Sequence, residues 1–269
     1  MIVFPNGKIN LGLSVLNKRT DGFHNIESVV YPVPIYDALE FQPSKKFTLS
    51  LYGMKIPGEI ENNIVFKAWK LLRDEHQIPP IEIKLFKGIP IGSGLGGGSS
   101  DAAFLVKYLN EYFDLGLSTE VLLQFAEKLG SDCPFFIKNS ATLIQGRGEI
   151  LKKMDLSLKE KYLVIVCPEV QVSTKEAFQE IQPSKSKTEL SEVISLPIDQ
   201  WQGKLVNDFE SLILKKHPIL KEIKILLKKK GALYTSLTGS GAAIYGIFDQ
   251  PVNVKNIFPD YFVWDGILN

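Results

Sequence analysis

The first regular pattern along the chain is a strict alternation of apolar and polar residues near the N-terminus. Apolar side chains occupy every second position from residue 9, namely Ile9, Leu11, Leu13 and Val15. This period predicts a strand with one buried face. Lys8 and Asn10 fall together on the other face, where two interpretations stay open: the pair reaches a common ligand, or it lies on an ordinary solvated edge.

A polar turn follows this strand. Residues 18–24 read Lys-Arg-Thr-Asp-Gly-Phe-His and lead into an apolar run at residues 29–35, which predicts a loop between two strands. Phe23 and His24 offer an aromatic face and a hydrogen-bonding ring to a planar ligand such as a nucleobase. A histidine that is simply solvated in a loop is the alternative.

Elsewhere the spacing predicts a mixture of strands and helices. Apolar runs or alternations predict strands at residues 38–41, 47–51, 81–86, 141–145, 163–167, 233–237 and 242–248. Helical spacing predicts helices at residues 63–76, 102–113, 117–129, 173–181, 189–194 and 219–227, and a further helical region from residue 206. Asn63 is expected to cap the first of these helices. A Pro-Ser-Lys loop is expected after residue 181, and the lysines near residue 220 fit the solvated face of an amphipathic helix.

A glycine-rich loop lies between a predicted strand and a predicted helix. Five of the twelve residues from Pro90 to Asp101 are glycine. Ser99 or Ser100 is expected to cap the following helix, with Asp101 in its first turn. Unpaired backbone N–H groups and the positive end of the helix dipole converge at such a place, and glycine lets an anion approach the backbone closely. The pattern therefore predicts an anion-binding loop.

Three other interpretations of this loop are weaker. A Walker loop requires a lysine before its final Ser or Thr, where this chain has Gly98. The dinucleotide pattern is matched by Gly92, Gly94 and Gly97, but a second helix follows where a Rossmann unit would return to a parallel strand. A flexible linker is disfavoured because a strand and a capped helix frame the glycines.

Two further turns carry candidate chemistry. Gly130 is expected to end the helix at residues 117–129, and Pro134 to prevent its immediate continuation. Asp132 lies between them, either as a functional carboxylate or as a turn aspartate bonded to its own backbone. Near the C-terminus, residues 238–241 read Thr-Gly-Ser-Gly and are expected to pack close to a ligand or to the first glycine loop.

Composition excludes several classes of function. The 269 residues include 31 Lys and Arg against 30 Asp and Glu, so neither nucleic acid nor a membrane surface is indicated as the main partner. Cys133 and Cys167 have no disulfide or zinc-ligand spacing, which favours a reducing, cytoplasmic environment. The polar residues of the N-terminal segment argue against a signal peptide, and no run approaches the roughly 18 apolar residues of a membrane span.

Taken together, the motifs resemble the GHMP kinase superfamily, which is named for galactokinase, homoserine, mevalonate and phosphomevalonate kinases. The resemblance spans nearly the whole chain and is carried by residues 7–11, 21–24, 90–100, 131–136 and 237–241. Within the superfamily, the motifs are most similar to the family that phosphorylates a cytidine-diphosphate-linked methylerythritol. The resemblance implies an α+β, two-lobed GHMP kinase fold, with a lobe like domain 2 of ribosomal protein S5 at residues 1–153 and a ferredoxin-like α/β sandwich at residues 154–269.

The resemblance also implies an activity and a set of site residues. The activity is ATP-dependent phosphorylation of the substrate's tertiary 2-hydroxyl, in the non-mevalonate route to isoprenoid precursors. Asp132 matches the general base, and Lys8 matches the residue that stabilises the transferred phosphate. The substrate set is Asn10, Phe23, His24 and, by a looser match, Phe178; a tyrosine is frequent in the family where this chain has Phe23. The ATP set is Asn63 with Pro90, Ile91, Gly92, Ser93, Gly94, Leu95, Gly96, Gly97, Gly98, Ser99 and Ser100.

Mg²⁺ is expected with ATP, and Ser100 is the candidate protein ligand. Two alternative functions stay open. Another GHMP kinase for a small alcohol would lack a nucleobase pocket at Phe23 and His24. A catalytically silent nucleotide- or RNA-binding protein is the second alternative, and the near-zero net charge together with the presence of both Lys8 and Asp132 argues against it.

Overall fold

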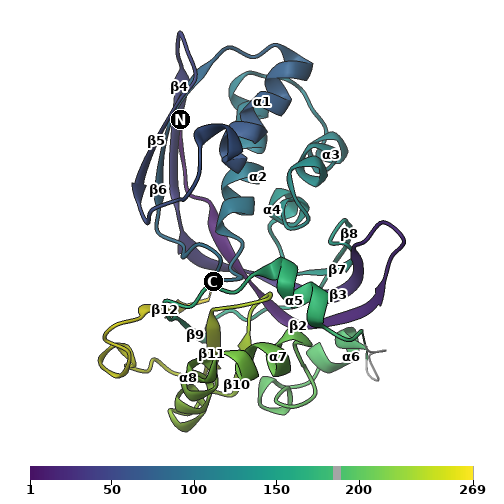
Figure 1. Ribbon diagram of the computed structural model, residues 1–269, viewed down its shortest axis with the longest axis vertical. Helices are drawn as coiled ribbons and strands as arrows, with labels where there is room; N and C mark the ends of the chain where they lie inside the picture. Colours follow the sequence, from purple (N-terminus) through teal and green to yellow (C-terminus); the bar gives the residue numbers. More distant parts are fainter. Residues whose placement is uncertain (184–188, 269) are drawn as a thin grey trace. The chain divides into compact units, whose positions relative to one another are not determined.

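Two units that are interleaved along the sequence make up the chain. The computed structural model describes residues 1–183 and 189–268 (Figure 1). Unit 1 comprises Met1–Gly7, Ile35–Ile91 and Gly96–Ser140, and unit 2 comprises Lys8–Pro34, Gly92–Leu95 and Ala141–Asn269. The chain therefore passes from one unit to the other inside two long strands, at both ends of the segment Gly92–Leu95, and between Ser140 and Ala141. The boundary between residues 153 and 154 stays a prediction.

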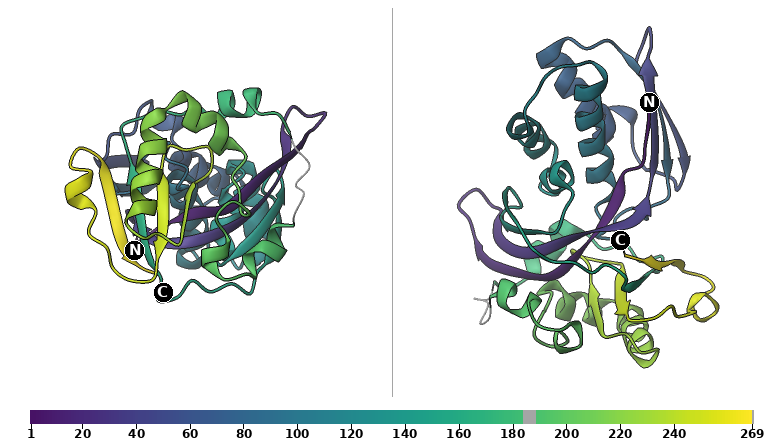
Figure 2. Two further views of the ribbon diagram at one scale, coloured as in Figure 1. Left: turned by 90° about the horizontal axis from the view of Figure 1, so that it is seen from below. Right: turned by 180° about the vertical axis from the view of Figure 1, so that it is seen from behind.

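Unit 1 contains one four-stranded sheet with helices on one face (Figure 2). The strand order is β1-β4-β6-β5, with β1 (Ile2–Val3), β4 (Ala38–Pro43), β5 (Thr48–Gly53) and β6 (Ile81–Lys87). The helices are α1 (Ile64–His76), α2 (Gly97–Tyr112), α3 (Thr119–Leu129) and α4 (Cys133–Lys138), and a 3₁₀ turn at Ile60–Asn62 precedes α1. β5 and β6 pair in parallel because α1 returns the chain to the same edge, whereas the other pairs of this sheet are antiparallel.

Unit 2 contains two four-stranded sheets. One has the order β2-β3-β7-β8, with β2 (Asn6–Lys18), β3 (His24–Tyr36), β7 (Thr142–Gly146) and β8 (Ile150–Lys153). The other has the order β10-β11-β9-β12, with β9 (Tyr162–Cys167), β10 (Tyr234–Leu237), β11 (Ile244–Phe248) and β12 (Phe262–Ile267). Its helices are α5 (Thr174–Glu180), α6 (Leu190–Ile194), α7 (Phe209–Lys216) and α8 (Pro218–Lys229), with 3₁₀ turns at Ile198–Gln200 and Lys255–Ile257.

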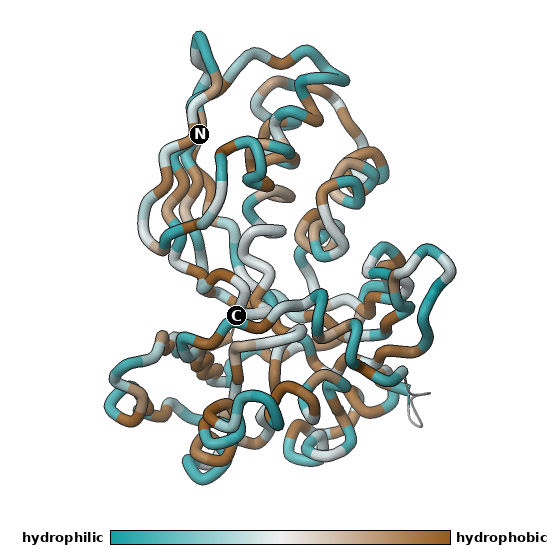
Figure 3. The backbone as a smooth tube through the Cα atoms, viewed as in Figure 1, coloured by the Kyte–Doolittle hydropathy of each residue, from teal (hydrophilic) through white to brown (hydrophobic). Residues whose placement is uncertain are grey.

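The hydrophobic pattern correctly predicts the buried apolar face of β2, but the opposite face is buried as well, so the prediction of a single buried face is wrong. The apolar residues of β2 are at most 5% exposed, as their alternation requires: Ile9, Leu11, Leu13 and Val15. Along the helices the backbone alternates between hydrophobic and hydrophilic stretches (Figure 3). α8 buries Leu220, Ile223 and Leu227 and exposes Lys221 and Lys228, which confirms the predicted amphipathic helix.

The start of α2 differs from the prediction. The helix begins at Gly97, its N-cap is Gly96 with φ of 73°, and no side chain caps it. The predicted serine cap is therefore wrong, and Asp101 lies one residue beyond the first turn. Packing explains the early start, because a Cβ at residue 97 would lie 2.9 Å from Cγ2 of Ile89. Close contact with the preceding strand end outweighs the low helix propensity of glycine.

The α+β class is confirmed, and strands and helices occur in every predicted region of the described chain. The sequence did not predict β1, β8, β12 or the short helix α4. The predicted Pro-Ser-Lys loop falls mainly on residues 184–188, which lie outside the described residues. In residues 1–183 and 189–268 no helix has the length and apolar character of a membrane span.

Candidate active site

The glycine loop has a backbone suited to holding an anion. Gly92, Gly94 and Gly96 have φ of 66°, 81° and 73°, while Ser93 and Leu95 between them keep negative φ. Such alternation turns successive N–H groups toward one concave side, an arrangement that binds anions. In unit 1, α2 begins directly after Gly96, and its first N–H groups and the positive end of its dipole are features that favour an anion.

The middle of the loop is hydrogen-bonded within unit 2 to two other predicted motifs. The backbone N–H of Lys8 donates to the carbonyl of Leu95 at 2.9 Å. The hydroxyl of Thr238 donates to the carbonyl of Gly94 at 3.2 Å. The prediction that the turn at residues 238–241 packs close to the first glycine loop is therefore confirmed.

At Gly94 the glycine loop packs directly against the backbone of Thr238, and we predict that substitution of this glycine destabilises the protein. A Cβ at residue 94 would lie 2.0 Å from the carbonyl oxygen of Thr238, whereas a Cβ at Gly92 would meet nothing within 4 Å. Both glycines have positive φ, so the Gly92→Ala variant controls for backbone strain. Gly94→Ala should lower the free energy of unfolding by about 1 to 3 kcal/mol more than Gly92→Ala. Urea denaturation measures both, and equal losses would contradict the close packing.

Lys8 and Asn10 are buried together in unit 2, at 3% and 2% exposure, so the interpretation as a solvated edge is wrong. Nζ of Lys8 donates to Oδ1 of Asn10 at 2.5 Å. The same oxygen accepts from the backbone N–H of Gly239 at 2.9 Å, and Nδ2 of Asn10 donates to the hydroxyl of Ser28 at 2.9 Å. The lysine ammonium is thus fixed beside the C-terminal glycine turn.

The predicted base-recognition residues also lie in unit 2. The rings of His24 and Phe178 stack with centroids 5.4 Å apart and planes inclined by 25°. The ring centroids of Phe178 and Phe209 lie 4.8 Å apart in an edge-to-face arrangement, so Phe209 supports the ring of Phe178. Phe23 is 51% exposed, and the guanidinium of Arg147 lies 5.0 Å from its ring centroid. These rings offer planar surfaces that suit a nucleobase.

We predict that His24 is neutral at pH 7. Partial burial lowers its pKa below 6.5, and the neighbouring charge of Lys18 lowers the pKa further. Because folding favours the neutral form, this contribution to stability is complete above about pH 6.5, the pKa of an unfolded histidine, and is lost as the pH falls through the folded pKa. NMR titration should give a midpoint below 6.5, and Lys18→Gln should raise it. An unchanged midpoint in that variant would exclude the effect of Lys18.

Asp132 lies in unit 1 at the start of a short buried helix. Three residues connect α3 to α4, and the N–H of Cys133 donates to the carbonyl of Gly130 at 3.1 Å to close this turn. Asp132 occupies the N-cap position, but its carboxylate does not cap α4. Pro134 is the second residue of the new helix, whose first five residues are all buried. The loop is therefore held firmly from its C-terminal side.

The far end of α4 is fixed as well. Asn139 has φ of 48° and ends the helix, and its N–H donates to the carbonyl of Phe135 at 2.7 Å. Its side chain forms a reciprocal amide pair with Asn6, with distances of 2.7 and 3.1 Å. Both ends of α4 are thus anchored within unit 1, which fixes the backbone that carries Asp132.

A buried ionic cluster lies in unit 1, and the pairing of its residues was not predicted from the sequence. Nζ of Lys87 donates to Oδ2 of Asp37 and, at 2.7 Å, to Oδ2 of Asp101. Oδ1 of Asp37 accepts from the backbone N–H groups of Gly88 and Ile89 at 2.7 and 2.9 Å. The cluster therefore joins the end of β6 to α2, the two elements that flank the loop.

Charge and burial compete strongly in this cluster. All three side chains are at most 3% exposed. Burial opposes the charged form of Lys87, but the carboxylates of Asp101 and Asp37 outweigh it and raise the lysine's pKa. Burial raises the pKa of Asp101 well above its usual value. A detectable signal exists in the sequence: Lys87 continues the period of Ile81, Ile83 and Leu85 on the buried face of β6.

Asn63 and Ser100 complete the predicted set in unit 1. Oδ1 of Asn63 accepts from the backbone N–H of Val65 at 2.9 Å, so its predicted capping role is confirmed. Its contact with a nucleotide stays a prediction. The hydroxyl of Ser100, in the first turn of α2, is fully buried and has no hydrogen-bond partner within the described part of the chain.

Comparisons with known proteins agree with this architecture. Residues 63–140 match the family model described as the GHMP kinases N terminal domain, and residues 198–262 match that described as GHMP kinases C terminal. A 4-diphosphocytidyl-2-C-methyl-D-erythritol kinase of Parabacteroides distasonis is 44% identical over 271 residues, covering 100% of both chains. One of Bacteroides thetaiotaomicron is 50% identical over 253 residues, covering 93% of this chain and 92% of that protein.

Solved structures show the same fold. The crystal structure of a 4-(cytidine 5'-diphospho)-2C-methyl-D-erythritol kinase superposes with a TM-score of 0.83 at 27% identity, covering 100% of this chain and 99% of that one. The mevalonate kinase of Methanococcus jannaschii superposes with a TM-score of 0.72 at 16% identity, covering 100% and 98%, which shows a shared fold.

Proposed function

This chain belongs to the 4-diphosphocytidyl-2-C-methyl-D-erythritol kinase family of the GHMP kinases, and we propose on that premise that it transfers a phosphoryl group from ATP to the 2-hydroxyl of 4-diphosphocytidyl-2-C-methyl-D-erythritol. This reaction belongs to the non-mevalonate synthesis of isoprenoid precursors. The observation that supports the nucleotide-linked substrate is the aromatic group in unit 2. In this group His24 stacks on Phe178, and Phe23, which precedes His24 in the sequence, is exposed.

The proposed chemistry divides between two side chains. Attack by a tertiary hydroxyl requires a base to take its proton, and the charge on the transferred phosphate requires a fixed cation. Asp132 is the base, presented at the start of the anchored helix α4. Lys8 is the cation, and the bond from its ammonium to Asn10 holds it in place before substrate arrives. Such preorganisation avoids reorienting the ammonium during the reaction.

The proposed ATP site is the glycine loop. The concave backbone at residues 92–96 and the N-terminus of α2 bind the phosphate oxygens. Asn63 lies near the nucleotide while it caps α1. The anion-binding backbone is present without any lysine in the loop itself, in contrast to a Walker loop.

Mg²⁺ fits this site as a partner of ATP. Among the described residues no group of three or more His, Cys, Asp or Glu side chains is placed to hold a metal ion. Mg²⁺ in nucleotide sites is held mainly by phosphate oxygens and water, with one or two protein groups. The buried hydroxyl of Ser100, which lacks a protein partner in the described chain, is the candidate ligand. Bound Mg²⁺ supplies neutralisation of phosphate charge.

The proposed base pocket uses rings and one imidazole. Phe23 and Phe178 supply stacking area, and neutral His24 supplies one hydrogen-bond donor and one acceptor to the cytosine edge. Phe23 has no hydroxyl, so it contributes area alone. Asn10 lies at the other end of the proposed substrate, next to Lys8.

Release of ADP from ATP tests the proposal with a panel of alcohols. We expect turnover with 4-diphosphocytidyl-2-C-methyl-D-erythritol and background rates with mevalonate and homoserine. Turnover with either of the latter and none with the cytidyl substrate would favour another small-alcohol GHMP kinase. ATP binding without ADP release for any alcohol would favour a silent nucleotide-binding protein.

A further inference from the structure

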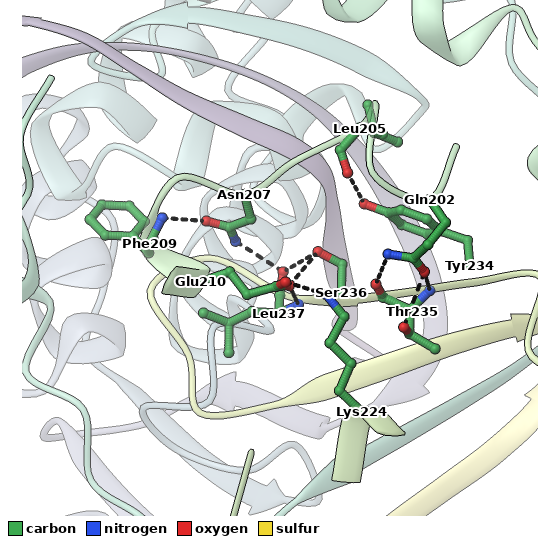
Figure 4. A network of polar contacts seen from close by, with 10 residues as sticks. All are labelled: Gln202, Leu205, Asn207, Phe209, Glu210, Lys224, Tyr234, Thr235, Ser236 and Leu237. Atoms are coloured by element: carbon green, nitrogen blue, oxygen red, sulfur yellow. Dashed lines mark hydrogen bonds and ion pairs between the residues drawn. The ribbon is translucent and has the colours of Figure 1, made fainter. Parts of the chain in front are cut away.

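A ring of hydrogen bonds within unit 2 leads back to the proposed catalytic lysine. It begins at Asn207, which is 1% exposed and precedes α7. Nδ2 of Asn207 donates to the carbonyl of Leu237 at 2.9 Å, and its Oδ1 accepts from the N–H of Phe209 at 3.0 Å (Figure 4). Nδ2 also donates to the carbonyl of Gly239 at 2.8 Å. Both amide hydrogens and the carbonyl oxygen of this side chain are therefore used.

The segment that carries Asn207 is fixed to β2. The N–H of Leu13 donates to the carbonyl of Val206 at 2.9 Å, and the N–H of Asp208 donates back to the carbonyl of Leu13 at 2.8 Å. Oδ2 of Asp208 accepts from the N–H of Val15 at 2.7 Å. The backbone on both sides of Asn207 is thus aligned with the strand that also carries Lys8 and Asn10.

The other end of the ring reaches the same strand through the glycine turn. The carbonyl of Gly239 accepts from the side chain of Asn207, and the backbone N–H of Gly239 donates to Oδ1 of Asn10 at 2.9 Å. That oxygen is the acceptor for Nζ of Lys8. A Cβ at residue 239 would lie 3.6 Å from Nζ of Lys8, so the turn and the ammonium are in close proximity. Movement of the turn therefore changes the environment of the ammonium directly.

We propose that Asn207 is a positioning residue for phosphoryl transfer, which acts through Gly239 and Asn10 to fix the ammonium of Lys8. This inference rests on the role of Lys8 in the proposed function. Without the two amide donors, the carbonyl of Gly239 loses the side chain that holds it, while the carbonyl of Leu237 keeps the hydroxyl of Ser236 at 3.3 Å. Gly239 is then held less firmly, which weakens the bond from its N–H to Oδ1 of Asn10, an oxygen that also accepts from the hydroxyl of Thr238 at 3.3 Å. The ammonium is then oriented less firmly toward the phosphate, although the residues that bind either substrate are unchanged.

A matched pair of variants separates positioning from general support of the fold. Asn207→Ala removes the two donors. Gln202→Ala also removes an amide that is hydrogen-bonded to β10, because Oε1 of Gln202 accepts from the N–H of Thr235 at 3.1 Å (Figure 4). The hydrogen bonds of this amide go to Thr235 and not to the glycine turn. We expect Asn207→Ala to lower kcat by roughly tenfold to a hundredfold, with KM for both substrates changed less than about twofold. Gln202→Ala should leave kcat within about twofold of the original protein.

Two readouts address the mechanism and the folding of the variants. Hydrogen exchange of the Gly239 amide should be faster in Asn207→Ala than in Gln202→Ala, measured on the full chain at equal fractions folded. In a Lys8→Met background, Asn207→Ala should lower the residual turnover by less than about twofold, because the effect passes through the lysine. If Asn207→Ala does not fold, Asn207→Ser, which keeps one donor, replaces it in all three measurements.

The outcomes distinguish this inference from the proposed function. Three outcomes would each overturn the positioning role. In the first, kcat falls and KM rises together with a loss of stability. In the second, Asn207→Ala and Gln202→Ala lower kcat equally, and in the third, neither Asn207→Ala nor Asn207→Ser folds. Absence of any turnover of the cytidyl substrate by the unsubstituted chain would instead contradict the proposed function. In that case the rate of hydrogen exchange at the Gly239 amide would still show whether Asn207 holds the turn.

Discussion

Replacing Asp132 with asparagine is expected to lower turnover of the cytidyl substrate by at least about a hundredfold. Asparagine keeps the shape of the side chain but cannot accept the proton of the attacking hydroxyl. Because the carboxylate does not cap α4, and because α4 is anchored by its buried residues and by Asn139, the fold should tolerate the change. ATP binding should largely survive, since the proposed ATP site is the glycine loop. Steady-state ADP release and a nucleotide titration measure the two effects.

Asp114→Asn is the matched control for this experiment. Asp114 is an exposed aspartate of unit 1, it has φ of 49°, and asparagine accepts such a conformation readily. Its replacement should change neither turnover nor the midpoint of thermal unfolding. If Asp132→Asn retains more than about a tenth of the original turnover, Asp132 is not the base. If both variants lose turnover equally, the loss comes from something other than the position of the carboxylate.

Replacing Lys87 with methionine is expected to destabilise the protein by about 3 to 5 kcal/mol. The change leaves the buried carboxylates of Asp37 and Asp101 without the cation that both contact. Asp37 then keeps only its two backbone N–H donors, and Oδ1 of Asp101 already lacks a hydrogen-bond partner in the described structure, so burial opposes the charge of both carboxylates. The free energy of unfolding from urea denaturation measures the loss.

Lys84→Met on the same strand is the control. Lys84 pairs with Glu40 at 3.5 Å, and its side chain is 45% exposed, so the ion pair contributes at most about 1 kcal/mol. Asp101→Asn is a second comparison: because burial raises the pKa of Asp101 well above its usual value, a neutral amide at this position should be tolerated better than loss of the lysine. Equal destabilisation by Lys87→Met and Lys84→Met would show that the buried cluster contributes no more to the free energy of unfolding than an exposed ion pair does.

The sequence predicted those features that depend on local periodicity. The alternation in β2, the amphipathic face of α8 and the cap of α1 by Asn63 all follow from residues a few positions apart. The glycine loop was predicted in place, but the start of α2 was not. Serine is a preferred N-cap residue, but the left-handed backbone of Gly96 occupies the N-cap position before the serines are reached. Close packing of Gly97 against Ile89 also favours this earlier start of α2.

Features that depend on distant residues could not be predicted from periodicity. Lys87 meets Asp37, which is 50 positions away, and Asn207 meets Gly239, which is 32 positions away. Neither pairing leaves a regular pattern, because the two partners lie in different segments of the chain and no periodicity links them. Phe178 was assigned to the substrate set only through resemblance to a family, and its contact with the ring of His24 was not predicted. The roles of Lys8 and Asp132 stay proposals.

Analysis of the reaction product by ³¹P NMR tests the central proposal most directly. The purified chain is incubated with ATP, Mg²⁺ and 4-diphosphocytidyl-2-C-methyl-D-erythritol, and the new phosphate monoester is observed without proton decoupling. A phosphate on the tertiary 2-hydroxyl gives a signal unsplit by a three-bond proton coupling, because that carbon carries no hydrogen, and we expect this signal to grow with the release of ADP. A split signal would place the phosphate on another hydroxyl, and absence of a monoester would show that this substrate is not phosphorylated; either result would contradict the proposed function.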